Sequence, residues 1–138
     1  MACKSLIGTA NTVSVAGLPN GSTLPLGSIS RRRGCQLGLI GNDILVKGEG
    51  YCDVKALATF VPSGTGVFTV YLYQDGVAVP GAVGSATIAS GNTATIPVNS
   101  IIATDNRTLG SRLSLVVTSN PTTATVTMNN LAVQVEKI

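Results

Sequence analysis

The 138-residue sequence predicts an all-β protein, and three observations carry that prediction. Apolar and polar residues alternate with a period of two, turn residues recur about every 8–12 residues, and no segment shows a sustained helical stripe. Residues 67–81 show the pattern best, because a strand runs into Asp75-Gly76 and a second one ends at Pro80-Gly81. Asp-Gly between two such runs favours a tight hairpin, in which both central residues need positive φ.

From residue 36 onward, strands are predicted between segments rich in glycine, proline and asparagine, such as Gly41-Asn42 and Asn120-Pro121. The expected strands cover 36–40, 43–47, 51–61, 67–74, 77–80, 83–89, 93–98, 100–103, 111–119, 123–128 and 131–137. Short strands at such regular spacing are typical of a sandwich or a barrel.

The alternation also predicts which side chains are buried, since successive residues of a strand point to opposite faces. Four strands have one clearly apolar face, made of Val54, Ala56, Ala58 and Phe60; Phe68, Val70 and Leu72; Leu113, Leu115 and Val117; and Leu131, Val133 and Val135. Each of these strands is expected to bury that face and to keep the other one wetter.

The length corresponds to one domain, in which two regions differ in amino-acid composition. Residues 1–34 are rich in glycine, serine and threonine, so we expect an N-terminal arm or an irregular edge, with a short strand near 12–16. Residues 35–138 hold the predicted sandwich. Charged residues make up only 11% of the chain, and the mean hydropathy is +0.40, which favours additional burial between subunits.

No apolar run approaches the roughly 18–20 residues of a membrane span. The first eight residues contain no apolar region typical of a signal peptide, so we expect a chain made and retained in a cytoplasm. Cys3, Cys35 and Cys52 have no metal-type spacing and are expected to be free thiols, with a Cys35–Cys52 bridge as the alternative.

Four segments, 51–60, 66–81, 113–117 and 131–138, together resemble the trimeric jelly-roll heads related to complement and tumour necrosis factor, especially short bacterial and phage versions. The resemblance covers about residues 43–138. It implies a two-sheet antiparallel jelly-roll sandwich that forms a homotrimer through the apolar face of one sheet. The candidate trimer-interface residues are Tyr71, Tyr73, Leu131, Val133 and Val135.

Residues 1–34 contain no collagen-like repeat or coiled-coil stalk, which departs from hormone-like or filament heads. A stalkless head of this size looks more like a structural phage virion protein, such as a capsid decoration protein or a fibre or tail component. The partners implied are further copies of the chain and a capsid or tail protein, and the expected location is the virion after synthesis in a host cytoplasm. The N-terminal arm would then make the attachment.

Arg31, Arg32 and Arg33 form the one basic cluster. They are interpreted either as a solvated loop or as an attachment site for an acidic surface or phosphates. Without interleaved aromatic residues they make a poor nucleic-acid site. Tyr71 and Tyr73 lie opposite the buried face of their strand, and three interpretations stay open for them: a subunit interface, a glycan-binding patch, or simple cover for the sheet.

The sequence indicates no enzyme and no cofactor. Histidine is absent, which removes the commonest general base and metal ligand. No spacing of the six acidic residues suggests a pair of catalytic carboxylates. For calcium, the only loop oxygens considered are those of Asp43, Asp105 and Asn106, and turn capping explains them better. The alternative to a virion component is a receptor- or glycan-binding head of a tail or cell-surface appendage.

Overall fold

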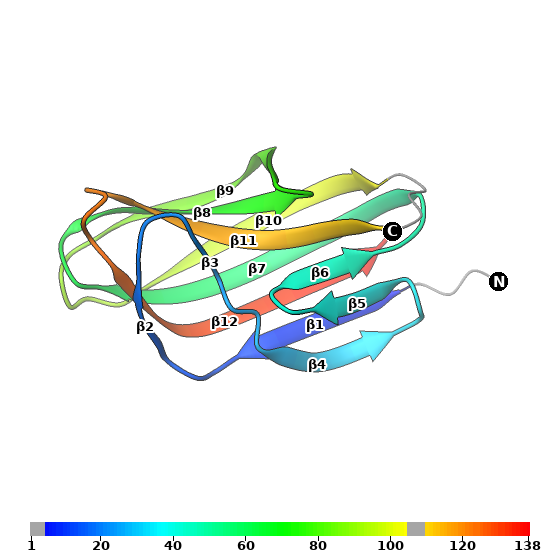
Figure 1. Ribbon diagram of the computed structural model, residues 1–138, viewed down its shortest axis with the longest axis horizontal. Helices are drawn as coiled ribbons and strands as arrows, with labels where there is room; N and C mark the ends of the chain where they lie inside the picture. The colour runs from blue at the N-terminus through cyan, green and yellow to red at the C-terminus, as the bar shows by residue number, and fades with distance from the viewer. Residues whose placement is uncertain (1–4, 105–109) are drawn as a thin grey trace.

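The computed structural model describes residues 5–104 and 110–138, which form two antiparallel sheets packed face to face (Figure 1). The first sheet contains, in spatial order, β10 (Ala94–Thr104), β7 (Gly50–Pro62), β12 (Val126–Lys137), β1 (Leu6–Asn11) and β4 (Ser28–Arg33), with β2 (Val15–Leu18) paired to β12. The second contains β5 (Leu37–Ile40), β6 (Asp43–Val46), β11 (Ser111–Asn120), β8 (Gly66–Gln74) and β9 (Val77–Ile88), with β3 (Ser22–Thr23) paired to β11. The predicted two-sheet antiparallel sandwich is confirmed. In the part of the chain that the structure describes, no helix is long and apolar enough to cross a membrane.

The hairpin predicted at Asp75-Gly76 is confirmed. It joins β8 to β9, and both central residues have positive φ, 52° for Asp75 and 82° for Gly76. The Asp75 carboxylate also accepts a hydrogen bond of 2.9 Å from the backbone N–H of Arg112. This contact ties the turn to the start of β11.

Three pairs of predicted strands are single continuous strands in the structure. Segments 77–80 and 83–89 belong to β9, and 93–98 and 100–103 belong to β10. Pro80 and Pro97 do not interrupt them, because β9 and β10 are edge strands, where a missing backbone donor is tolerated. The third pair forms β12, in which a bulge between Met128 and Asn130 replaces the expected break.

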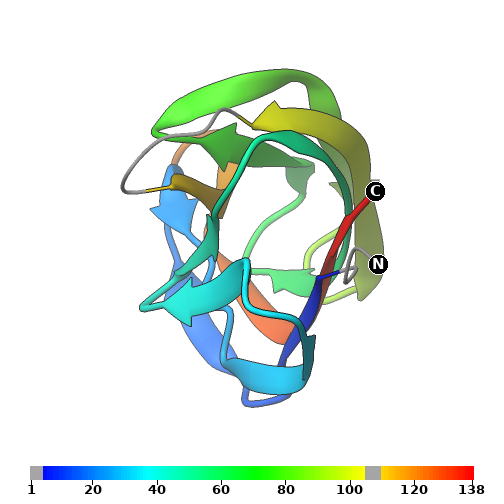
Figure 2. The same ribbon diagram turned by 90° about the vertical axis from the view of Figure 1, so that its right-hand side faces the viewer.

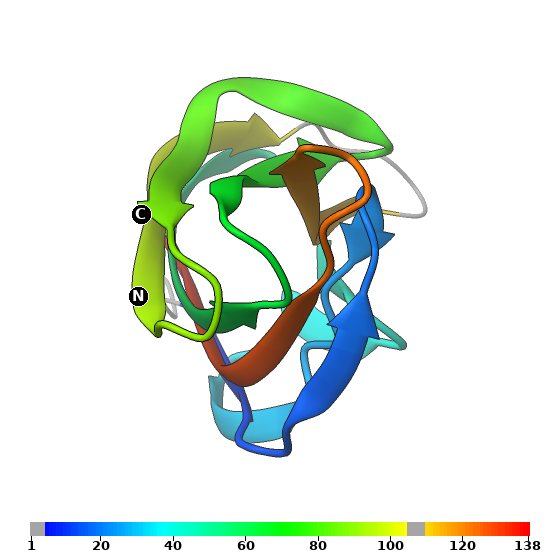
Figure 3. The ribbon, with the colours of Figure 1, turned by 90° about the vertical axis from the view of Figure 1, so that its left-hand side faces the viewer.

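The core lies between the two sheets, and the strands surround it when the molecule is viewed along its long axis (Figures 2 and 3). Every residue of the four predicted apolar faces is buried, and Phe60 and Phe68 are fully inaccessible. Burial also corrects one expectation. Leu131, Val133 and Val135 were predicted to lie at a trimer interface, but they fill the core of a single chain, because the opposite sheet already covers their side of β12.

Residues 6–33 contribute strands to the sandwich and do not form a detached arm. Strand β1 lies between β12 and β4, and the side chains of Ile7, Leu24 and Leu26 are buried in the core. The backbone N–H of Leu24 donates to the carbonyl of Leu115 over 2.8 Å. The irregular-edge interpretation fits only β4, which is an edge strand, and the short strand expected near 12–16 begins three residues later, as β2.

Candidate functional site

The arginine cluster lies on a strand and not in a loop, which corrects one of the two interpretations made from the sequence. Arg31 and Arg33 pair across the ladder with Gly8 and Leu6 of β1. Because they are two residues apart, both point to the outward side of the first sheet. Arg32 points the other way, and its Nε donates to the backbone carbonyl of Leu37 over 3.0 Å, which links the edges of the two sheets.

The predicted interface residues do not come together. Tyr71 and Tyr73 are half-buried on the outward side of the second sheet, on the face opposite Phe68, Val70 and Leu72, as the alternation predicted. The remaining candidates, on β12, point into the core. No single surface of one chain therefore contains the predicted set.

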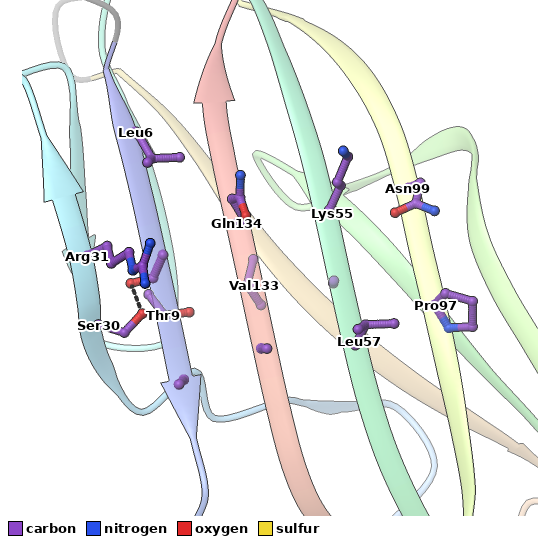
Figure 4. A pocket seen from close by; sticks show the side chains of 14 residues that line it. Leu6, Thr9, Ser30, Arg31, Lys55, Leu57, Pro97, Asn99, Val133 and Gln134 are labelled. Atoms are coloured by element: carbon purple, nitrogen blue, oxygen red, sulfur yellow. Dashed lines mark hydrogen bonds between the residues drawn. The ribbon is translucent and has the colours of Figure 1, made fainter.

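A different surface stands out, namely the outward side of β10, β7, β12, β1 and β4, which we call the open face. It carries a hollow of about 490 Å³ (Figure 4). The backbone register arranges its side chains in rows across the sheet. One row is apolar and consists of Pro97, Leu57, Ala132 and Ala10. The next is polar and consists of Asn99, Lys55, Gln134, Gly8 and Arg31.

Small residues create the hollow, and the same sheet face also exposes large apolar residues, of which Leu57 lines the hollow. Gly8 and Ala132 leave the middle of the sheet without long side chains. Three apolar side chains of β7 and β10 project from the same face and are largely wet, with exposed fractions of 50% for Leu57, 62% for Tyr51 and 63% for Ile101. A well-packed sandwich that leaves such side chains on one concave face has a surface suited to a partner.

The open face was not predicted from the sequence, because the alternation was used only to find the buried side of each strand. A signal was nevertheless present. On β7 the core-facing positions next to Leu57 are Ala56 and Ala58, so the largest aliphatic side chain of the central segment is on the wet side. A large apolar side chain on the solvent side of a strand, with small ones on its core side, indicates that another molecule covers this face.

Charges on the open face are only partly paired. Lys55 Nζ lies 3.8 Å from an Asp53 carboxylate oxygen, and both side chains are open to water, so the pair contributes little stability. Glu136 stands directly opposite Asp53 in the β7–β12 ladder. Two carboxylates therefore lie side by side, with one nearby cation.

The described residues offer no assembled catalytic or metal centre. They contain no group of three or more histidine, cysteine or acidic residues able to hold a metal ion. Of the calcium candidates, Asp43 has its Oδ2 atom 3.7 Å from Nη1 of Arg112. Asp105 and Asn106 lie outside the described residues.

Two of the three thiols lie in the described residues, and they are free and differ in environment. Cys35 is exposed at the turn after β4, whereas Cys52 is buried in the core. Burial raises the pKa of the Cys52 thiol, and the positive charge of Lys137 opposes that rise. A protonated, buried thiol is a poor nucleophile.

Hydrogen bonds of serine and threonine hydroxyl groups join three loops at the end of the sandwich where β7 turns into β8. Ser63, between β7 and β8, accepts hydrogen bonds at Oγ from the backbone N–H of Thr125 over 3.0 Å. Ser90, after β9, donates through Oγ to the Ser63 carbonyl over 3.1 Å, and its N–H donates to Thr65 Oγ1 over the same distance. These loops contain no aromatic or charged residue at 62–66, 89–93 or 120–125.

Comparison with known proteins supports the fold. No protein-family model matches the chain, and no curated protein sequence matches it. Among solved structures, it is similar to murine APRIL, with a TM-score of 0.72, 10% identity and coverage of 98% of this chain and 99% of that one. The globular domain of zebrafish complement 1qA gives a TM-score of 0.66, 6% identity and coverage of 97% and 96%. The PRD1 vertex protein P5 gives 0.64, 14% identity and coverage of 100% and 99%. The chain thus has the jelly-roll fold of these proteins.

Proposed function

We propose that this chain is the trimeric head of a structural virion protein, which decorates a phage capsid or belongs to a fibre or tail. The main support for the proposal is the open face, which has a hollow lined by Leu57 and also exposes Tyr51 and Ile101 in an otherwise well-packed sandwich. Burial of such a face between copies of the chain removes apolar surface from water and gives each copy the same environment. A catalytic role has no support in the described side chains.

The virion assignment is supported by the likeness to a phage vertex protein. It is also consistent with the described residues, which contain no cluster of histidine, cysteine or acidic residues able to hold a metal ion. Since a shared fold does not determine function, the assignment needs its own test. The attachment proposed from the sequence also changes. Because β1 to β4 lie within residues 6–33, we now assign the attachment to the exposed arginines of β4 instead of a free arm.

A receptor- or glycan-binding head is less well supported. The loops joined by Ser63 and Ser90 offer hydroxyl and amide groups but no aromatic platform for a sugar ring. Tyr71 and Tyr73 are on a strand, half-buried, and away from these loops.

The first test is the mass in solution by light scattering after size-exclusion chromatography. A trimer has a mass of about 42 kDa, three times the 14.0 kDa of one chain. Leu57→Asp should dissociate it without unfolding the chain, because the side chain is half exposed in one copy. Val77→Asp is the matched control, since Val77 is 69% exposed on β9, off the open face.

The second test is the presence of the chain in particles purified from an infected or induced host, followed by mass spectrometry and immunogold labelling. The proposal requires peptides of this chain and label on the particle surface. A monomeric wild type, or a trimer absent from every purified particle, contradicts the corresponding half of the proposal.

A further inference from the structure

The charged side chains of the open face are distributed unevenly: the exposed edge carries only arginines, and the middle of the sheet carries two carboxylates and Lys55. Arg31 and Arg33 lie on the edge strand β4, whereas the carboxylates Asp53 and Glu136 lie on β7 and β12 in the middle of the sheet. One row across the sheet contains both signs and consists of Arg33, Leu6, Glu136, Asp53 and Ile101.

The two carboxylates are poorly compensated within one chain. Asp53 and Glu136 are direct cross-strand partners, and like charges in that position destabilise a sheet. Lys55 Nζ stands 3.8 Å from an Asp53 carboxylate oxygen, but the carboxylate of Glu136 has no hydrogen bond or ion pair within the described residues. The apolar side chains of Leu6 and Ile101 flank the pair at either end.

Arg31 and Arg33 also lack an acidic partner among residues 5–104 and 110–138. Neither Arg31 nor Arg33 has an ion pair within the part of the chain that the structure describes. Arg33 is separated from Glu136 by the whole width of β1, with Leu6 in between. Their backbones are two strand spacings apart, about 10 Å, and no ion pair joins Arg33 to Glu136 among the described residues.

We propose that the arginines of one copy pair with Asp53 and Glu136 of the next copy across the open face. This inference rests on the proposed self-association and adds the contacts that determine how two copies align. A basic edge and an acidic centre on the same face are complementary between copies, although they do not meet within one copy. The apolar row around Leu57 supplies the buried area, and the charges select the alignment in which opposite signs meet. The second copy is thus the acidic partner that the arginine cluster requires.

The test reverses each charge cluster separately and then both together. The variants are Arg31→Glu with Arg33→Glu, Asp53→Lys with Glu136→Lys, and the fourfold combination. We expect each pair of reversals to weaken self-association by about tenfold or more, because like charges then face each other between copies. The fourfold variant should associate within about threefold of the wild type, because opposite signs meet again.

Controls separate this effect from a general loss of charge or of folding. Lys47→Glu and Glu49→Lys reverse exposed charges in the turn between β6 and β7, off the open face, and should leave the mass unchanged. Circular dichroism and thermal melting report whether each variant is folded. If a reversal unfolds the chain, Arg31→Gln with Arg33→Gln replaces it. Wild-type association should also weaken between about 50 mM and about 1 M salt, where screening shortens from more than 10 Å to about 3 Å.

The outcomes distinguish this inference from the proposed function. A monomeric wild type contradicts self-association itself. A trimeric wild type whose mass survives both reversals, or a fourfold variant that does not recover, contradicts only the ion pairing. If the arginine reversal leaves the trimer intact and removes it from particles, the arginines bind the particle instead and the inference is wrong.

Discussion

Gly84→Ala should destabilise the fold where the two sheets meet at their edges. Strands β9 and β10 run close together there, and a Cβ built on Gly84 would collide with the carbonyl oxygen of Pro97 and lie 2.8 Å from Cγ2 of Ile96. The backbone at Gly84 is not left-handed, so the methyl group itself causes the conflict. Pro97 belongs to the open face, which connects this contact to the proposed function.

Two effects of opposite sign determine how much Gly84→Ala changes the free energy of unfolding. Replacement of glycine by alanine restricts the unfolded chain and stabilises by about 0.4–1 kcal/mol where the native conformation permits it. Relief of the clash requires β9 and β10 to separate by about 1 Å, and overpacking of this kind costs about 1–3 kcal/mol, occasionally more. Since the obstacle is backbone, we expect a net loss near the upper end, about 2 kcal/mol, or a fall in melting temperature of about 6–8 °C.

Chemical denaturation followed by circular dichroism measures this loss directly. Gly64→Ala is the matched control, because no atom lies within 4 Å of the added Cβ and its backbone is not left-handed either. The control should raise the free energy of unfolding by about 0.4–1 kcal/mol, because only the restriction of the unfolded chain acts there. If Gly84→Ala is as stable as the wild type, the close approach of β9 to β10 does not exist and the reasoning fails.

Two further predictions concern the thiols and the hydroxyl-linked loops. At about pH 8, a thiol reagent should modify Cys35 in the folded protein and Cys52 only after unfolding, as shown by peptide mapping, because Cys52 is buried with a raised pKa. The neutral Cys52 thiol should stabilise the fold fully below the unfolded pKa of about 8.5 and lose that contribution as pH rises toward the folded value, which denaturation at several pH values checks. Ser63→Ala removes the acceptor for the Thr125 N–H and should lower the free energy of unfolding by about 0.5–1 kcal/mol, with Thr122→Ala in the same region as the neutral control.

Alternation and turn chemistry predicted most of the fold. The pattern at 67–81 predicted a hairpin because both Asp75 and Gly76 had to take positive φ, and they do. The core of β7, β8, β11 and β12 was predicted for an equally local reason, namely that apolar side chains two residues apart share a face.

The strands of the first 34 residues could not be predicted in the same way. Segment 6–11, Leu-Ile-Gly-Thr-Ala-Asn, has one strongly apolar position on its buried side, Ile7, followed by the polar Thr9 and Asn11. Strand β4 is exposed along its whole length, so it has no hydrophobic alternation. Both are strands because their backbones extend a sheet that the rest of the chain has built, and that tertiary cause leaves little trace in local sequence.

The same distinction explains why the interface residues were predicted on the wrong side of β12. Alternation shows that Leu131, Val133 and Val135 must be covered, but it does not say by what. In this chain the second sheet covers them. An interface between copies therefore has to use the opposite side of β12, where Ala132 and Gln134 line the hollow. On the neighbouring β7 that side carries Leu57 between two core alanines. Antiparallel sheets of a sandwich commonly have one face on the core and one in water, so a large apolar residue on the outward face is an exception. The outward leucine is therefore the best residue with which to test whether a second copy of the chain provides the missing cover.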